Sequence, residues 1–91
     1  EDIILADINQ TTLMIYSRDG IYQTTETLTR FQQRISSSNF IQVSRHAVIN
    51  IDHLESLSDS FSGNMTAKLT NQIKTEVSRR YVKLLMEYLG I

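Results

Sequence analysis

The sequence of 91 residues contains no cysteine, no apolar run long enough to cross a membrane and no glycine-rich loop. The lack of cysteine excludes disulfides and thiolate metal sites, and it fits the reducing cytoplasm, where we expect the protein to act. A membrane-spanning helix needs roughly 20 apolar residues in succession, so we expect no membrane contact by this domain. Without a glycine-rich loop the chain lacks the usual phosphate cradle of nucleotide-binding enzymes. No signal peptide is visible.

The residues that are present suit one folded domain. Hydrophobic residues make up 41% of the chain, which includes four tyrosines and three phenylalanines. This composition is typical of a globular core and not of a disordered tail. The length supports a single core, so we expect one domain over residues 1–91. Because the first residue is Glu1 and not Met, we also expect the domain to be a piece of a longer protein.

Alternating apolar and polar residues predict a mainly β fold built from short strands. The Asp19-Gly20 pair is a strong hairpin signal between the second and third strands. No strand–helix–strand repeat requires parallel pairing, so we expect small antiparallel sheets. The strands are expected at residues 3–5, 13–17, 21–25, 40–43, 47–51, 54–57, 65–69 and 73–77, with loops at 36–39 and 58–64.

Two short helices are expected where apolar residues recur at helical spacing. Thr27 is a suitable N-cap for the first helix. Ser78 is expected to cap the second helix, and Gly90 to end it. The expected buried positions are Leu28, Phe31 and Ile35 in the first helix and Tyr81, Leu84, Leu85, Tyr88 and Leu89 in the second.

Positive charge gathers at two places in a chain whose net charge is only −1. From residue 68 to residue 83, five basic residues accompany a single acidic one. Earlier in the chain, Arg45 and His46 stand between two apolar runs that read as buried strands. Burial of such groups is costly, so we expect both side chains to be displayed at an exposed corner.

The start of the second helix is a candidate anion site. Arg79 and Arg80 would lie in its first turn, where the helix dipole is already positive, so this arrangement is favourable if an anion binds there. The Ser78 hydroxyl and the first helix amides would add donors for a phosphate. A pair of simply solvated arginines is the alternative, and spacing alone does not choose between the two. Arg45, if held rigidly at its corner, could bind guanine bidentately.

Catalytic and metal chemistry find little support in the residue pattern. His46 and His53 are the histidines of the chain, and they lack the spacing of a metal site. Asp52, Ser44 and Ser78 could be drawn into a triad, but nothing in their spacing requires one. We therefore expect no enzyme activity, no metal and no cofactor.

Two segments stand out as a pair. The first, from Phe40 to Leu54, reads F-I-Q-V-S-R-H-A-V-I-N-I-D-H-L, and the second, from Val77, reads V-S-R-R-Y-V-K-L-L. Together they resemble the LytTR-type DNA-binding domain of bacterial transcription regulators. That family typically shows F-x-R-x-H-R-S-x-x-V-N-x-x-x-I and then V-S-R-x-Y at the start of a near-terminal helix. The resemblance covers nearly all of the chain and implies small stacked antiparallel sheets with two short α-helices.

The resemblance also implies a function. It implies binding of double-stranded DNA by loops inserted into successive major grooves, with two domains on adjacent half-sites as a dimer. It further implies a place in a bacterial response regulator of a two-component system. The family's base-contacting positions correspond to Arg45, Arg79, Asn9 and Gln10. Positions near the DNA backbone correspond to Ser44, His46, Ser78, Arg80 and Lys83.

Several residues depart from the family pattern. Ser44 replaces a common histidine, Gln42 a common arginine, and His46 a residue that is usually small. The early loop carries Asn9-Gln10 in place of Gly-Asn-Tyr. These differences bear on affinity and sequence preference. The alternative function is a protein-interaction module that uses its exposed arginines to bind an acidic partner.

Overall fold

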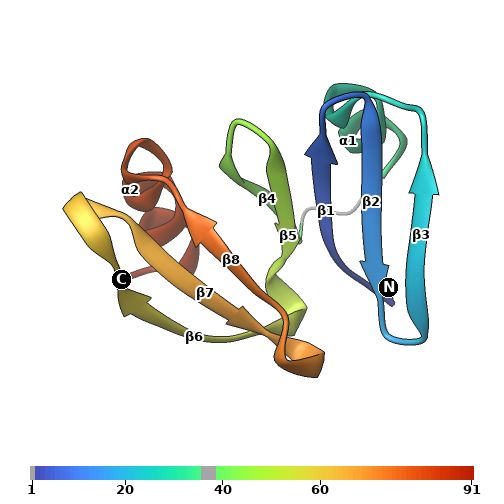
Figure 1. Cartoon of the computed structure of the whole chain (residues 1–91). Helices are drawn as coiled ribbons and strands as arrows, with labels where there is room; N and C mark the ends of the chain where they lie inside the picture. Colours follow the sequence, from blue (N-terminus) through green and yellow to red (C-terminus); the bar gives the residue numbers. More distant parts are fainter. Residues whose placement is uncertain (1, 36–38) are drawn as a thin grey trace.

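A computed structural model describes residues 2–35 and 39–91. Three strands, a helix, five strands and a second helix follow one another along the chain (Figure 1). The strands are β1 (Ile3–Asn9), β2 (Thr12–Ser17), β3 (Gly20–Thr24), β4 (Phe40–Ser44), β5 (Ala47–Asn50), β6 (Leu54–Asp59), β7 (Met65–Leu69) and β8 (Lys74–Val77). The helices are α1 (Leu28–Arg34) and α2 (Arg79–Leu89), with short 3₁₀ turns η1 (Ile51–His53), η2 (Phe61–Gly63) and η3 (Thr70–Gln72).

Antiparallel pairing builds two sheets, which confirms the predicted fold class. One sheet has five strands in the order β3-β2-β1-β5-β4, and the other has three in the order β6-β7-β8. The predicted hairpin at Asp19-Gly20 joins β2 to β3. β1 lies between β2 and β5, so the first strand pairs with a strand that follows much later in the chain. This long-range pairing brings the β1–β2 turn beside the β4–β5 turn.

The central strands of the five-stranded sheet, β1 and β5, are buried on both faces. On one face, residues of β1, β2 and β5 pack against Leu28 and Phe31 of α1. On the other face, β1, β4 and β5 pack against the three-stranded sheet and Leu85 of α2. The neighbours Val48 and Ile49 belong to opposite faces, as the alternation of side chains along a strand requires. The layers are therefore α1, the five-stranded sheet, and the three-stranded sheet with α2.

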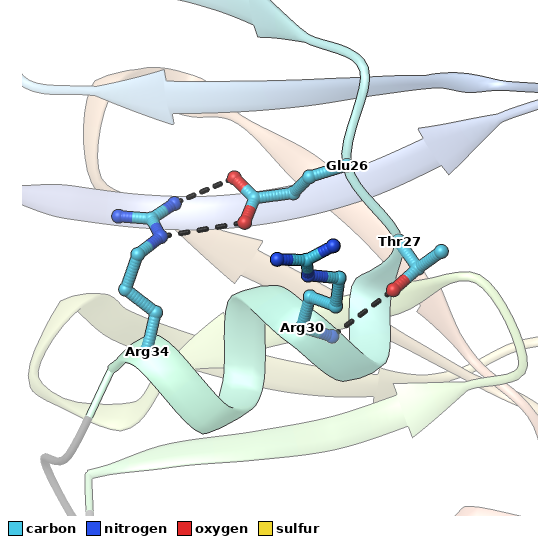
Figure 2. Close-up of polar contacts among 4 residues, drawn as sticks. All are labelled: Glu26, Thr27, Arg30 and Arg34. Atoms are coloured by element: carbon cyan, nitrogen blue, oxygen red, sulfur yellow. Dashed lines mark hydrogen bonds and ion pairs between the residues drawn. The ribbon is translucent and has the colours of Figure 1, made fainter.

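Helix α1 begins where the sequence predicted. The Thr27 hydroxyl accepts a hydrogen bond from the backbone N–H of Arg30 at 3.1 Å, which satisfies one of the amides left unpaired at a helix start. Figure 2 shows this cap and the ion pair beside it, in which Arg34 donates to both carboxylate oxygens of Glu26 at 2.7 and 3.3 Å. The hydrogen bond to Glu26 raises the pKa of Arg34. The pair ties the segment that enters α1 to the last turn of that helix.

Helix α2 has the predicted ends but a different buried face. It begins after Ser78 and ends at Gly90, whose φ of 79° is left-handed. Leu85 is fully buried, but Leu84 and Tyr88 are 57% and 44% exposed. The prediction that these two side chains are buried was wrong. The helix rests mainly on β4 and covers it with one narrow apolar stripe, which leaves the neighbouring positions in solvent.

Two strands run further than the sequence pattern indicated. β1 continues past Leu5 to Asn9, because its polar residues keep their backbone pairing with β2. β6 extends to Asp59, which pairs with Met65, so the loop predicted at 58–64 begins at Ser60. Of the loop predicted at 36–39, residues 36–38 lie outside the described residues. Within residues 2–35 and 39–91, no helix has the length and apolarity to span a bilayer.

Candidate nucleic-acid interface

Two turns that carry predicted site residues lie together at one end of the five-stranded sheet, the upper end in Figure 1. The backbone N–H of Ile8 in β1 donates to the carbonyl of His46 at 2.8 Å. The His46 ring Nδ1 lies 2.9 Å from Oδ1 of Asp7, also in β1. These contacts tie the β4–β5 turn to the strand that leads into the β1–β2 turn. We call Asp7, Asn9, Gln10, Arg45 and His46 the Arg45 cluster.

Hydrogen bonds of two β4 residues, Gln42 and Ser44, stabilise the β4–β5 turn. Ser44 is only 3% exposed, and its hydroxyl accepts from the backbone N–H of His46 at 3.3 Å. The Gln42 side-chain amide donates to the Ser44 carbonyl at 2.9 Å. Arg45, at the tip, is exposed and forms no ion pair with any residue in the described ranges. The turn therefore presents a guanidinium whose hydrogen-bond donors are available to a ligand.

The β1–β2 turn has an uncommon backbone. Gln10 has a φ of 59°, in the left-handed region that residues with a Cβ rarely adopt. Asn9 and Gln10 are both exposed, and they line one shallow, mostly polar depression. A neighbouring depression is lined by Asn9 together with Asp7 and His46. The two amide side chains thus stand at the same end of the sheet as Arg45.

The start of α2 gathers the remaining predicted residues. Arg79 and Arg80 are exposed, and they line a shallow depression with Ser78 and with two residues of the β6–β7 loop, Ser62 and Asn64. Lys83 follows Arg79 by four positions, so it lies on the same side of the helix, and it too is exposed. We call Ser78, Arg79, Arg80 and Lys83 the Arg79 cluster.

The cap of α2 differs from the one that the sequence predicted. Ser78 occupies the N-cap position, but its side chain makes no capping hydrogen bond. Asn64 supplies the oxygen instead, and its Oδ1 accepts from the backbone N–H of Arg79 at 2.8 Å. That amide is therefore not available to a phosphate. The first turn of α2 contains no acidic residue, so the positive end of the helix and two guanidinium groups stand together without a compensating charge there.

One strand joins the two clusters. The backbone N–H of Ser78 donates to the carbonyl of Val43 in β4 at 2.8 Å. Val43 directly precedes Ser44, which braces the β4–β5 turn. The same end of β4 thus anchors both clusters, and the sheet sets the separation between them.

Two supporting residues, Asp7 and Asn64, are not predicted by the sequence pattern. Asp7 meets His46 from a strand far earlier in the chain, and Asn64 meets Arg79 from a different hairpin. No short-range sequence pattern predicts either contact, because each contact depends on how the strands pair. Among the predicted residues, Ser44 is the one whose side chain the fold buries.

The other polar groups considered for chemistry have structural partners. His53 is buried, and its Nδ1 lies 3.0 Å from the Thr70 hydroxyl. Asp52 accepts a hydrogen bond from the Asn39 side-chain amide at 2.8 Å. Over the ranges 2–35 and 39–91, no three His, Cys, Asp or Glu side chains gather in a way that could hold a metal ion.

The sequence pattern of one family, described as the LytTr DNA-binding domain, matches residues 1–90. The chain belongs to this family. The sensory transduction protein LytR of Staphylococcus epidermidis is 32% identical over 90 residues, which are 99% of this chain and 36% of that protein. LytT of Enterococcus faecalis is 32% identical over 91 residues, or 100% of this chain and 38% of that protein. This LytTr chain spans little more than a third of the length of these relatives.

A third relative and a solved structure agree with this assignment. The transcriptional regulatory protein LytR of Staphylococcus aureus is 30% identical over 77 residues, 85% of this chain and 31% of that protein. A LytTr DNA-binding domain from Bacillus cereus has the same fold, with a TM-score of 0.89 and 14% identity. The match covers 99% of this chain and 83% of that one. At this low identity the likeness shows the fold, which is the one predicted.

Proposed function

We propose that this LytTr domain binds double-stranded DNA in a sequence-specific manner, as the output domain of a bacterial transcription regulator. The observation that carries the proposal is the pair of exposed arginines, Arg45 and Arg79, held by two clusters that one end of β4 anchors. Neither guanidinium has an ion-pair partner within the described ranges. A planar guanidinium with free donors matches O6 and N7 of guanine in the major groove.

Four residues are proposed to contact bases. Arg45 and Arg79 are each expected to donate two hydrogen bonds to a guanine. Asn9 and Gln10 carry amide side chains, which pair bidentately with N6 and N7 of adenine. The exposure of both amides beside Arg45 supports this role.

Phosphate contacts are proposed for residues at the edges of the two clusters. Arg80 and Lys83 flank Arg79 on the exposed side of α2, and His46 flanks Arg45. The Ser78 hydroxyl, which does not cap α2, is free to donate to a phosphate. Ser44 was expected to join this set, but its hydroxyl is buried and holds the His46 amide. We therefore propose that Ser44 shapes the turn that presents Arg45 and His46.

The arrangement of the two clusters supports contacts in successive major grooves. One cluster lies at the β4–β5 turn and the other at the start of α2, and one end of β4 anchors both. We propose that the two clusters enter neighbouring grooves of the DNA. We further propose that two copies bind repeated half-sites as a dimer on DNA.

The relatives suggest the wider setting. Proteins named for sensory transduction and transcriptional regulation contain a matching segment but are much longer. We propose that residues 1–91 are one domain of a two-component response regulator in the cytoplasm, without enzymatic activity, metal or cofactor of its own.

A titration against DNA tests the proposal. The binding sequence is first selected from random duplexes with the purified domain, and affinity is then measured by fluorescence anisotropy over a range of salt. The logarithm of the binding constant should fall with the logarithm of salt, with a slope near −0.9 times the number of phosphates contacted. Arg18, in the β2–β3 turn at the other end of the sheet, supplies the matched control Arg18→Ala, which should bind as the parent does.

The same titration can reject the proposal. If Arg45→Ala and Arg79→Ala both bind the selected site as tightly as the parent, the domain does not read DNA with these residues. If the parent binds no duplex at low salt, the protein-interaction module is favoured, in which the arginines would bind an acidic partner.

A further inference from the structure

The loop between β6 and β7, residues 60–64, touches Arg79 at two points. The Asn64 side chain accepts from the Arg79 backbone N–H at 2.8 Å. Gly63 lies against the aliphatic part of the Arg79 side chain. A Cβ added to Gly63 would come within 2.9 Å of Arg79 Cδ and 3.2 Å of Arg79 Cγ. The loop thus holds both the backbone and the stem of one residue that we propose reads DNA.

The 60–64 loop has a well-defined shape of its own. The Ser60 N–H donates to the Asn64 carbonyl at 2.9 Å, and the Asn64 N–H donates to the Phe61 carbonyl at 3.1 Å. Ser62 and Gly63 both have left-handed backbones, with φ of 59° and 86°. These features turn the chain so that Gly63 faces Arg79 without a side chain between them.

We infer that the 60–64 loop is a positioning element that sets the direction of the Arg79 side chain before DNA is bound. This inference rests on the proposed role of Arg79 in base contact. A long exposed arginine otherwise samples many rotamers, and fixing one of them on binding lowers affinity. Contact along Cγ and Cδ removes part of that freedom in the free protein and leaves the guanidinium exposed.

The absence of a side chain at residue 63 is central to this role. In Gly63→Ala the new methyl group would overlap Arg79 Cδ. Because the Arg79 side chain is long and exposed, the overlap would be relieved by moving that side chain and not by unfolding the domain. The variant therefore redirects Arg79 without removing it. A left-handed φ of 86° adds backbone strain to the same substitution.

Gly90 provides a matched control for that strain. Its φ is 79°, but a Cβ there would meet nothing within 4 Å. Gly90→Ala thus introduces similar backbone strain at the far end of α2 with no contact to Arg79. A difference in DNA recognition between the two alanine variants then reports the contact with Arg79 alone.

The experiment combines affinity, base preference and side-chain mobility. Affinities for the selected duplex are measured for the parent, Gly63→Ala, Gly90→Ala, Arg79→Ala and the Gly63→Ala/Arg79→Ala pair, each corrected for its folded fraction. We expect Gly63→Ala to weaken specific binding about three- to tenfold and to relax preference at the same base pair as Arg79→Ala. In the Arg79→Ala background, Gly63→Ala should have no further effect on DNA binding. Relaxation of the Arg79 Nε–Hε signal without DNA should show greater mobility in Gly63→Ala and not in Gly90→Ala.

The outcomes separate this inference from the proposed function. If Arg79→Ala binds as the parent does, the base-contacting role of Arg79 fails. If Arg79→Ala weakens binding but Gly63→Ala acts like Gly90→Ala, or adds its full effect in the Arg79→Ala background, only the positioning role fails. Should Gly63→Ala not fold, Asn64→Ala replaces it in the same cycle and in the relaxation measurement, with the same expected and contrary results.

Discussion

The two clusters present their arginines by different means. The Arg45 turn joins β4, the edge strand of the larger sheet, to β5, every residue of which is buried. Two hydrogen bonds of His46 fix the shape of this turn: the His46 carbonyl accepts from the Ile8 N–H of β1, and the His46 N–H donates to the Ser44 hydroxyl. Arg79 stands at the edge of the smaller sheet, where Asn64 and Gly63 of an exposed loop hold it. One arginine is thus positioned by the core and the other by a surface loop.

The clusters also differ in charge. The Arg45 cluster includes the carboxylate of Asp7, which lies against His46. The first turn of the helix that carries Arg79 and Arg80 has no acidic residue. We infer that the Arg79 cluster supplies more of the general attraction to phosphates and that the Arg45 cluster depends more on specific contacts. With a net charge of only −1 across the chain, attraction to DNA has to come from such local concentrations of charge.

The largest expected effect comes from removing the core beneath the Arg45 turn. Ile49 in β5 is fully buried in the cluster that joins both sheets to α2. Ile49→Ala should lower the free energy of unfolding by about 2–5 kcal/mol, because it leaves a cavity. Chemical denaturation measures this loss, and Ile21→Ala, at a side chain that is 60% exposed, is the control expected to change it little. A small effect of Ile49→Ala would mean that the core does not stabilise this turn as described.

The arginines themselves should give the next largest effect, and on binding only. Arg45→Ala and Arg79→Ala should each weaken specific DNA binding by about 1–3 kcal/mol and leave the stability nearly unchanged, because both side chains are exposed. The two losses should add in the double variant, since the clusters share no side-chain partner among residues 2–35 and 39–91. Anisotropy titrations test this. Strong non-additivity would show that the two positions act as one unit and would remove the distinction drawn between them.

The residues of the candidate site can be predicted from the sequence where their signal is local, and not where it depends on how the strands pair. Arg45 could be recognised because charged residues interrupt two apolar runs, a signal contained within a few positions. The sequence signal for the start of α2 at Ser78 also lies within a few positions, and both predicted ends of α2 were confirmed. The supports of these residues could not be predicted. Asn64 caps α2 from another hairpin, and Asp7 reaches His46 only because β1 pairs with β5. The exposure of Leu84 likewise depends on how α2 lies on β4.

Loss of the loop support should have a moderate effect on stability. Asn64→Ala removes the acceptor for the first amide of α2 and should cost about 0.5–2 kcal/mol, the range found for helix caps. This is less than the cost of Ile49→Ala, because no core packing is lost. Thermal denaturation measures the change. Asn64→Asp keeps an acceptor oxygen and should retain most of the stability; an equal loss in both variants would contradict the capping role.

The smallest effect is expected at the β1–β2 turn, where a matched pair of glutamines separates backbone strain from DNA contact. Gln10 and Gln72 have φ of 59° and 61°, and Gln72 lies in η3, at the hairpin end that contacts the β2–β3 turn through the neighbouring Asn71. Glycine adopts this left-handed backbone without a Cβ clash, but it loses more conformational entropy on folding. Because the two effects oppose each other, each Gln→Gly change should alter the free energy of unfolding by no more than about 1 kcal/mol. The sign of the change should be the same in both variants. Only Gln10→Gly should weaken DNA binding and relax the base preference. If Gln72→Gly weakens binding equally, the β1–β2 turn has no special part in recognition, and the Arg45 cluster would reduce to Arg45, His46 and Asp7.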